Sequence, residues 1–302
     1  MSDRSRIDRR QLLAGLAAGA AGISALTASG NAGATHDAYD PDLKRGYTRT
    51  RFGLVHYWLS GGGPFLTLLH QASQSSNEFA PIAPYLADNY RVLAIDMVGH
   101  GRSDEPDHEL TAEEYMEAAM AVLDDLGIEK THLVGHHSGA MMAMGIAADH
   151  PERVDKVVLS GIGKRDEERI KAFFETPLTR DLPVDAEGDF LAKTWSVYRS
   201  MSAPMTPPEV TFLPFMVGLE ARIRTYDAHY AILRWNEAEA RARLKHTVLL
   251  LEGQYDFYVN DQEALLAEMP GSSREYIPDC GAFMFHEKPG EIAEVILRYL
   301  DA

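Results

Sequence analysis

The segment Gly135-His136-His137-Ser138-Gly139 has residue types and a spacing that suit catalysis. Two small residues flank a central position, and the segment joins an apolar run to a second run rich in Met and Ala. This pattern is typical of a nucleophile elbow, a strained strand-to-helix turn that exposes its central side chain and requires small neighbours. The centre is expected to be Ser, Cys or Asp, whereas here it is His137. An imidazole at this place offers general-base or nucleophilic chemistry.

Ser138, one residue further along, is the alternative nucleophile. A turn centred on Ser138 would put His136 at a position that requires a small residue, so we reject that frame. The Ser138 side chain stands at the start of the following helix and is expected to cap it.

Metal chemistry is the other use that twelve histidines suggest. His136 and His137 are adjacent, so their side chains are expected to diverge and not to bind one ion. The predicted helices hold no His-x-x-x-His pair with a carboxylate, and Cys280 is the single cysteine, so neither a metal site nor a thiolate cluster is expected. No Gly-x-Gly-x-x-Gly follows a first strand, so no dinucleotide cofactor is expected either.

The elements that must position His137 alternate between two kinds. Runs typical of strands cover residues 51–59, 65–69, 91–95, 131–134, 157–159, 247–251 and 275–277. Helical patterns cover residues 79–86, 112–126, 140–148 and 291–300, and Thr111 with Glu114 forms a capping box. Strands that alternate with helices over short connections predict an α/β fold, with a mostly parallel central sheet and helices on both faces.

Residues 163–244 break this alternation. Charged helices over 166–174 and 228–243 flank proline-rich turns, and no buried strand is apparent. We therefore predict a helical cap insertion at 163–244 within a core formed by residues 46–162 and 245–302. The aromatic residues of the insertion are expected mainly to form its own core and partly to line an apolar pocket: Trp195, Tyr198, Phe212, Phe215, Tyr226, Tyr230 and Trp235.

Several landmarks occur in a fixed order around the elbow. Gly-Gly-Gly-Pro at 61–64 and Leu-Leu-His-Gln at 68–71 precede Asp-Met-Val-Gly-His-Gly-Arg-Ser-Asp at 96–104, and Leu-Glu-Gly-Gln-Tyr-Asp at 251–256 precedes the loop 281–289. In this order they make the chain, from about residue 46 to 300, similar to α/β-hydrolases with a helical cap. The resemblance implies a hydrolase that acts on a small molecule.

Two of the three catalytic positions depart from that family. The resemblance puts the triad acid at Asp256, but it puts the nucleophile at His137 and the base at Ala282, so a Ser-His-Asp mechanism in its usual form is not available. The ring of His137 can fill the space that Ala282 leaves and reach Asp256. We hypothesise a His137–Asp256 dyad, in which the carboxylate fixes the tautomer and raises the pKa of a general base. The alternative is that His137 only fills a hole in a lost site.

Four further residues are candidates for the oxyanion site or the substrate pocket. By the resemblance, the Ser138 N–H binds an oxyanion, and the Gln71 amide can add a donor. His70 is expected to brace its loop. His286 is either a displaced base or a residue that caps the following helix.

The first 34 residues are typical of an export signal. Four arginines precede an Ala/Gly/Leu run, and Ala32-Gly33-Ala34 provides a small-x-small cleavage site. Within this segment, the motif Asp8-Arg9-Arg10-Gln11-Leu12-Leu13 resembles the bacterial twin-arginine signal. We predict a signal peptide at 1–34 and a periplasmic or secreted protein.

The net negative charge of the chain limits the classes of partner that it is expected to bind. The whole chain has a formal net charge of −16, and removing the four Arg and two Asp of residues 1–34 leaves 25 basic and 43 acidic side chains, a charge near −18. Such a surface repels nucleic acid and anionic lipid. We expect a small-molecule substrate or ligand, no nucleic acid and, after signal removal, no membrane partner; the oligomeric state stays open.

Three functions are compatible with these residues. The first is a cofactor-free enzyme that hydrolyses, or cleaves as a lyase, a small apolar carbonyl compound at an ester, a lactone or a C–C bond, with His137 as base. The second is a non-catalytic small-ligand-binding protein of the same fold. The third is a hydrolase that passes through an acyl-imidazole on His137.

Overall fold

The computed structural model describes residues 43–175 and 181–302; the predicted signal peptide lies outside these residues. Its centre is an eight-stranded sheet in the order β1-β2-β4-β3-β5-β6-β7-β8. The strands are β1 (Lys44–Thr50), β2 (Gly53–Ser60), β3 (Phe65–Leu69), β4 (Arg91–Ile95), β5 (Thr131–His136), β6 (Val154–Ser160), β7 (Val248–Gly253) and β8 (Ser273–Ile277). Pairs β1·β2 and β2·β4 are antiparallel and all the others are parallel, which confirms the predicted fold class.

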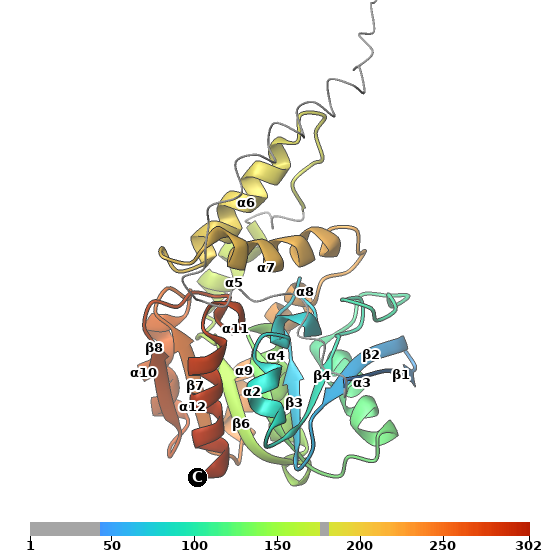
Figure 1. Ribbon diagram of the computed structural model, residues 1–302, viewed down its shortest axis with the longest axis vertical. Coiled ribbons are helices and arrows are strands. Elements are labelled where there is room, and N and C mark those ends of the chain that lie inside the picture. The colour runs from blue at the N-terminus through green and yellow to red at the C-terminus, as the bar shows by residue number, and fades with distance from the viewer. Residues whose placement is uncertain (1–42, 176–180) are drawn as a thin grey trace, which may run out of the picture. The chain divides into compact units, whose positions relative to one another are not determined.

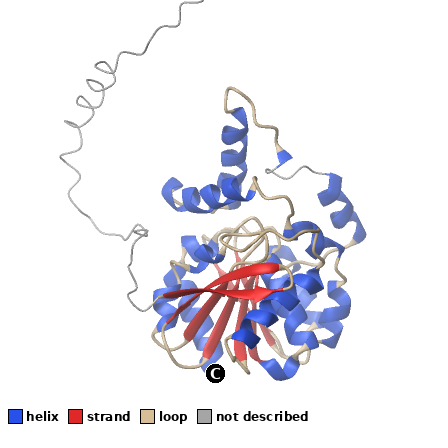
Figure 2. Cartoon of the chain, turned by 90° about the vertical axis from the view of Figure 1, so that its right-hand side faces the viewer, coloured by secondary structure: helices blue, strands red, loops and turns tan. Residues whose placement is uncertain are grey.

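Helices cover both faces of the sheet (Figure 2). One face packs against α2 (Ala83–Ala87), α11 (Met284–Glu287) and α12 (Pro289–Asp301), and the other against α3 (Ala112–Asp125), α4 (Ser138–Asp149), α8 (Ala228–Arg234) and α10 (Gln262–Glu268). Successive strand residues point to opposite faces: Leu133 joins the α3/α4 layer, whereas Val134 joins the α2/α12 layer. This two-sided burial explains why the strands read as continuous apolar runs.

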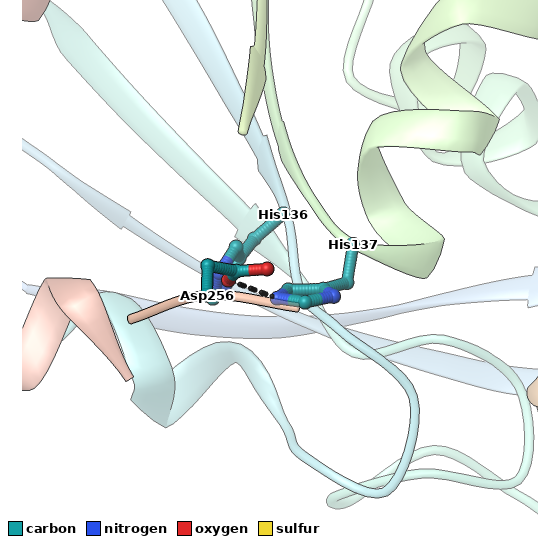
Figure 3. Close-up of side chains that lie close together, drawn as sticks. All are labelled: His136, His137 and Asp256. Carbon is teal, nitrogen blue, oxygen red and sulfur yellow. Dashed lines mark hydrogen bonds and ion pairs between the residues drawn. The ribbon is translucent and has the colours of Figure 1, made fainter. Parts of the chain in front are cut away.

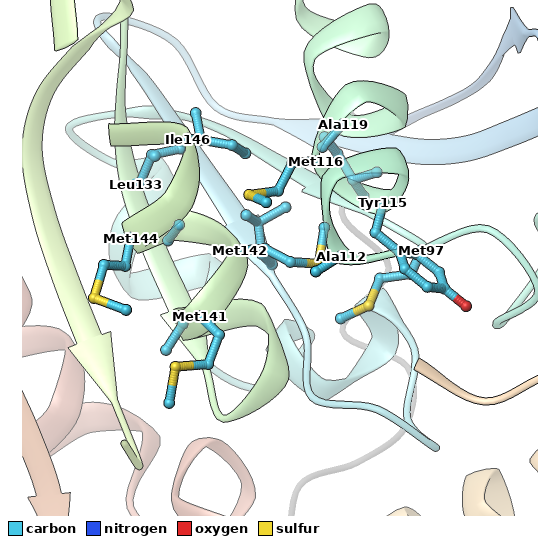
Figure 4. Packing of buried hydrophobic residues seen from close by; sticks show 14 of the residues in the cluster. Met97, Ala112, Tyr115, Met116, Ala119, Leu133, Met141, Met142, Met144 and Ile146 are labelled. Carbon is cyan, nitrogen blue, oxygen red and sulfur yellow. The ribbon is translucent and has the colours of Figure 1, made fainter. Parts of the chain in front are cut away.

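The α3/α4 layer is rich in methionine (Figure 4). Met142 of α4 lies beside Met116 of α3, whereas Met141 and Met144 extend from the other side of α4; all four are buried in the same cluster. Unbranched thioether chains fill irregular gaps between a helix pair and a sheet. The N-terminus of α3 has the predicted capping box, because Thr111 accepts from the Glu114 N–H and the Glu114 carboxylate accepts from the Thr111 N–H. Helix α4, which begins directly after His137, is almost wholly buried in this layer.

Three predicted elements have different boundaries. The strand expected over 51–59 is β2, which begins only at Gly53 because Arg51 and Phe52 form a turn and Gly53 has φ 114°. Strand β1, which precedes this turn, was not predicted. The helix expected over 79–86 is a 3-10 turn, Ser76–Phe79, followed by α2, which has Pro84 in its first turn. The helix expected over 228–243 is interrupted at Trp235, because the Asn236 side chain caps a new helix, α9 (Glu237–Arg243).

Between β6 and β7 the described residues form α5 (Glu167–Glu175), α6 (Asp189–Met201), α7 (Pro208–Ala221), α8 and α9. Helices α6 and α7 lie beyond the carboxyl ends of the parallel strands (Figure 1). Tyr198 of α6 stacks on Phe283 with ring centroids 5.4 Å apart, and Gln74 donates to the Pro214 carbonyl of α7 at 3.0 Å. These contacts attach the insertion over the end of the sheet. None of the helices described is long and apolar enough to cross a membrane.

Candidate active site at the β5–α4 turn

His137 occupies the apex of the turn between β5 and α4. Its backbone has φ 46° and ψ −110°, and its N–H donates to the Ser160 carbonyl of β6 at 2.8 Å. A Cβ atom at Gly135 would collide with the backbone of Gly139, and one at Gly139 would collide with the Leu69 carbonyl. The small-residue frame is therefore required by backbone approach. A left-handed φ at a non-glycine residue is the strain expected of an elbow.

The predicted contact between His137 and Asp256 is present. His137 Nε2 lies 2.9 Å from Asp256 Oδ2, although 119 residues separate the two in sequence. Figure 3 shows the His137 ring directed at the carboxylate, with its second nitrogen pointing away from Asp256. Asp256 comes from the loop after β7, and its Oδ1 accepts from the Tyr258 N–H at 3.2 Å. The His137 side chain is 13% exposed and that of Asp256 is 1% exposed, so only the imidazole reaches the space beyond the strands.

This pairing opposes the effect of burial. Burial lowers the pKa of His137, but the charge and hydrogen bond of Asp256 outweigh it, so the pKa is raised. Burial acts on Asp256 in the opposite sense, and there the His137 partner outweighs it and lowers the pKa of the carboxyl. An ionised Asp256 that holds the Nε2–H of His137 leaves the other ring nitrogen as the base.

His136, which lies next to His137 and Asp256, belongs to a buried hydrogen-bond network. Its Nδ1 lies 2.5 Å from Glu78 Oε1, and neither side chain is more than 1% exposed. Glu78 also accepts from the Gln71 N–H at 3.0 Å and from the Gln71 side-chain amide at 2.7 Å. Burial raises the pKa of Glu78, but His136 and Gln71 outweigh it and lower that pKa to about 2. Glu78 is thus a buried carboxylate that accepts three hydrogen bonds.

The expectation that His136 and His137 diverge is wrong. Their rings meet edge to face with centroids 4.5 Å apart, and one ligand atom from each of His136, His137 and Asp256 lies within 4.8 Å of the others (Figure 3). The physical reason is the left-handed φ of His137, which interrupts the strand alternation that sends consecutive side chains to opposite faces.

The candidates for the oxyanion site are placed differently from one another. Gln71 uses both its backbone N–H and its amide on Glu78, so the structure gives that amide another partner than an oxyanion. The expectation that the Ser138 side chain caps α4 is wrong: His137 is the N-cap, and among the described residues no side chain caps this helix. The N–H of Ser138 stands in the first turn of α4, where backbone N–H groups have no intrahelical acceptor. The oxyanion role of this N–H stays a prediction.

His70 and His286 lie to either side of the network. His70 accepts from the Met97 N–H at 2.9 Å and lies 2.7 Å from the Gln71 carbonyl, so it braces the loops after β3 and β4 as expected. His286 lies in α11, where burial lowers its pKa to about 4. It does not cap α12, because Lys288 is the N-cap there, and Asp256 is already engaged with His137. Nothing in this geometry makes His286 a displaced base.

Two acidic residues lie in or next to the site although the sequence does not single them out. Besides Glu78, Glu252 lies at the end of β7, where burial and the Asp256 carboxylate raise its pKa and Gln262 donates to it at 2.7 Å. Ala282, at the expected place of the base, is fully buried, and its carbonyl lies 3.5 Å from the Gln71 amide. The only sequence signal for Glu252 is a charged residue inside an apolar strand run. Glu78 has no comparable signal.

Residues 64–289 match the sequence profile of the alpha/beta hydrolase fold. The chain belongs to this family. Among relatives of this α/β-hydrolase, an uncharacterized carboxylesterase of Bacillus subtilis is 26% identical over 85% of the chain and 86% of its own length. A fluoroacetate dehalogenase of a Burkholderia species is 38% identical, but over only 32% of the chain and 33% of its own length.

Solved structures share the fold. An N-acyl homoserine lactone degrading enzyme aligns with a TM-score of 0.70 and 22% identity, over 84% of this chain and 100% of its own. The naproxen esterase of Bacillus subtilis aligns with a TM-score of 0.68 and 23% identity, over 85% of this chain and 91% of its own. At this level of identity the alignments establish the architecture. The relatives of this chain include an esterase, a dehalogenase and a C–C hydrolase, all of which are hydrolases.

Proposed function

We propose that this α/β-hydrolase hydrolyses a small, apolar carbonyl compound, an ester or lactone, with His137 as general base and Asp256 as its orienting partner. The observation that carries the proposal is the 2.9 Å contact between His137 Nε2 and Asp256 Oδ2 at the apex of a strained turn. Strained backbone and perturbed acid-base pairs both concentrate at functional sites. A ring that only filled a hole would not need a buried carboxylate aligned on its Nε2.

The reaction follows from the two ring nitrogens. Asp256 holds the Nε2–H, and Nδ1 takes a proton from a water molecule as its oxygen adds to the substrate carbonyl. The N–H groups at the start of α4, that of Ser138 first, stabilise the oxyanion of the tetrahedral intermediate. The intermediate collapses to the acid, and the leaving alkoxide takes the proton back from Nδ1. The imidazolium that forms in between is stabilised by Asp256.

Apolar side chains favour an apolar substrate. Phe257 and Tyr258 lie beside His137, with ring centroids 6.3 and 5.7 Å away. Tyr198, Phe215 and Phe283 form a buried aromatic cluster where the cap meets the core. The names of relatives, a carboxylesterase and an N-acyl homoserine lactone degrading enzyme, support the same chemical class.

The test is the initial rate on a panel of activated esters and lactones. We expect His137→Ala and Asp256→Asn to lose turnover by about 100-fold or more, because each removes part of the base. His150→Ala is the matched control, since His150 is exposed at the other end of α4. Equal turnover in wild type and His137→Ala would reject the proposal. An acyl adduct on His137, detected by mass spectrometry under burst conditions, would replace the general-base route with an acyl-imidazole.

We also propose that the protein is exported through a twin-arginine signal. The motif around Arg9 and Arg10 and the small-x-small site at 32–34 support this proposal. Fractionation of a bacterial host should find the wild type in the periplasm and the Arg9→Lys/Arg10→Lys variant in the cytoplasm. Equal export of both would contradict the proposal.

A further inference from the structure

His136 has a ring nitrogen that the hydrogen-bond network leaves over. Its Nδ1 bonds to Glu78, whereas its Nε2 is buried without a hydrogen-bond partner among the described residues. The His136 side chain is wholly inaccessible. Buried polar atoms are nearly always satisfied, and an unsatisfied one in a native structure can mark strain, a catalytic role, or a place for a water or an ion. The bond to Glu78 assigns the proton to Nδ1 and leaves a lone pair on Nε2.

His136, His137 and Asp256 each offer one ligand atom, and these atoms lie within 4.8 Å of one another. Since Nδ1 of His136 is bonded to Glu78, we take its unpartnered Nε2 as the ligand atom. A tetrahedral ion with bonds of about 2.1 Å needs ligand atoms about 3.4 Å apart. The 2.9 Å contact of His137 with Asp256 must open by about half an ångström.

The surroundings supply the second requirement of a metal site. Metal-binding histidines usually donate their other ring N–H to a carboxylate, which fixes the ring and the tautomer. The Glu78 carboxylate does this for His136, and Gln71 in turn holds Glu78 with two N–H groups. The other oxygen of Asp256 accepts from the Tyr258 N–H. Two carboxylates close to two imidazoles also make the local charge favourable for a dication.

We propose that His136 Nε2, His137 Nε2 and Asp256 Oδ2 bind one divalent transition-metal ion. Two imidazoles and one carboxylate suit zinc and its first-row neighbours, whereas magnesium and calcium prefer oxygen ligands. The ion replaces the proton between His137 Nε2 and Asp256 Oδ2. In a neutral ring this proton moves to Nδ1, and an imidazolium releases one of its two protons to solvent. Three protein ligands leave a fourth position open, on the side where His137 is 13% exposed.

This inference concerns the same residues as the proposed hydrolase but does not depend on its activity. In the metal-free protein His137 is a base held by Asp256; in the metal-bound protein both are ligands. Binding and turnover can therefore fail independently, and each is measured separately.

The test uses the full chain after treatment with a chelator and exhaustive dialysis. Calorimetry with Zn²⁺ should give one site per chain, and Co²⁺ should give the intense visible absorption of a site with fewer than six ligands. We expect Asp256→Asn and His136→Ala to weaken Zn²⁺ binding at least 100-fold, and Glu78→Gln, which alters only the orienting carboxylate, to weaken it about 10–100-fold. His132→Ala is the matched control, because His132 lies on the same strand outside the cluster and should leave binding unchanged.

The outcomes separate the two proposals. The metal site is overturned if Zn²⁺ does not bind below millimolar concentration. It is also overturned if the double variant His136→Ala/His137→Ala still binds Zn²⁺. Turnover by the metal-free protein in that case leaves the proposed hydrolase intact. Asp256→Asn nearly preserves the shape of the side chain, so its loss of binding supports the site even where His136→Ala unfolds. Binding without turnover in either state supports the metal site and rejects the hydrolase.

Discussion

Gly161 lies directly against the imidazole of His137. A Cβ atom at position 161 would be 2.7 Å from both Nε2 and Cδ2 of that ring, closer than real Cβ contacts. Gly161 follows β6 with φ 66°, and its N–H donates to the Leu251 carbonyl at 3.1 Å. The missing side chain at position 161 thus leaves the space in which His137 turns toward Asp256.

Replacing Gly161 by alanine should displace the His137 ring. We expect Gly161→Ala to lower kcat about 100-fold, since a shift of about 1 Å in a catalytic group has an effect of that size. The new alanine must also adopt a left-handed φ, which lowers the free energy of unfolding by about 1–2 kcal/mol. Gly127→Ala separates the two effects, because Gly127 has φ 65° and open space around its Cβ position. Equal losses of kcat in both variants would show that strain, and not contact with His137, is responsible.

The pH dependence of turnover should report the raised pKa of His137. A base works when neutral, so kcat/KM measured in the presence of a chelator should rise with pH, with a midpoint above the ordinary value of 6.5. In Asp256→Asn, burial remains and the attraction of the carboxylate is lost, so the midpoint of any residual activity should fall below that of the wild type. A profile that is flat between pH 6 and 9, or a midpoint that Asp256→Asn leaves unchanged, would contradict this role.

The titration of His137 should also change the stability of the fold: turnover rises with pH, whereas the contribution of His137 to stability falls. The folded pKa of His137 is raised, so its contribution is fully present below pH 6.5 and is lost as pH rises through the folded value. The difference in Tm between wild type and His137→Gln should therefore shrink as pH rises over this window. A constant difference from pH 6 to 9 would contradict it.

The His136–Glu78 pair should limit stability in acid. Glu78 has a pKa lowered from 4.5 to about 2, so its contribution is present above pH 4.5 and is lost as pH falls toward 2. Urea unfolding at pH 7 should show His136→Ala to be less stable by about 3–5 kcal/mol, because a buried carboxylate loses its partner. The double variant with Glu78→Gln should recover part of that loss. Additive losses would show that the two side chains are not coupled.

The sequence predicts the parts of this fold that depend on local chemistry. The strands 65–69 and 91–95 are found as β3 and β4 without change, and the Thr111–Glu114 capping box is present. Apolar runs and caps are local signals, so they survive in any tertiary context that buries them. The break at Asn236 was missed because a side-chain cap competes with an otherwise continuous helical pattern.

The site shows where sequence reasoning ends. The contact of His137 with Asp256 follows from family order, and the required smallness of Gly135 and Gly139 follows from the elbow pattern. The approach of His136 to His137 depends on one backbone angle. The burial of Glu78 depends on how the segment 71–79 folds to bring it against His136. The spacing of residues along the sequence predicts neither.

Glu252 should make the folded protein less stable as pH rises. Burial and the neighbouring Asp256 raise its pKa above 4.5, so at neutral pH the folded protein keeps a proton there that the unfolded chain has lost. Its contribution to stability is therefore present below pH 4.5 and declines, by up to about 1.4 kcal/mol per pH unit, as pH rises toward the folded value. Glu252→Gln keeps the size of the side chain and removes this titration, so its free energy of unfolding relative to wild type should increase between pH 5 and 9 in urea melts. Glu263→Gln is the matched control, since Glu263 is exposed on α10. Parallel pH profiles for wild type and Glu252→Gln would mean that Glu252 is ionised beside Asp256 and would contradict the raised pKa.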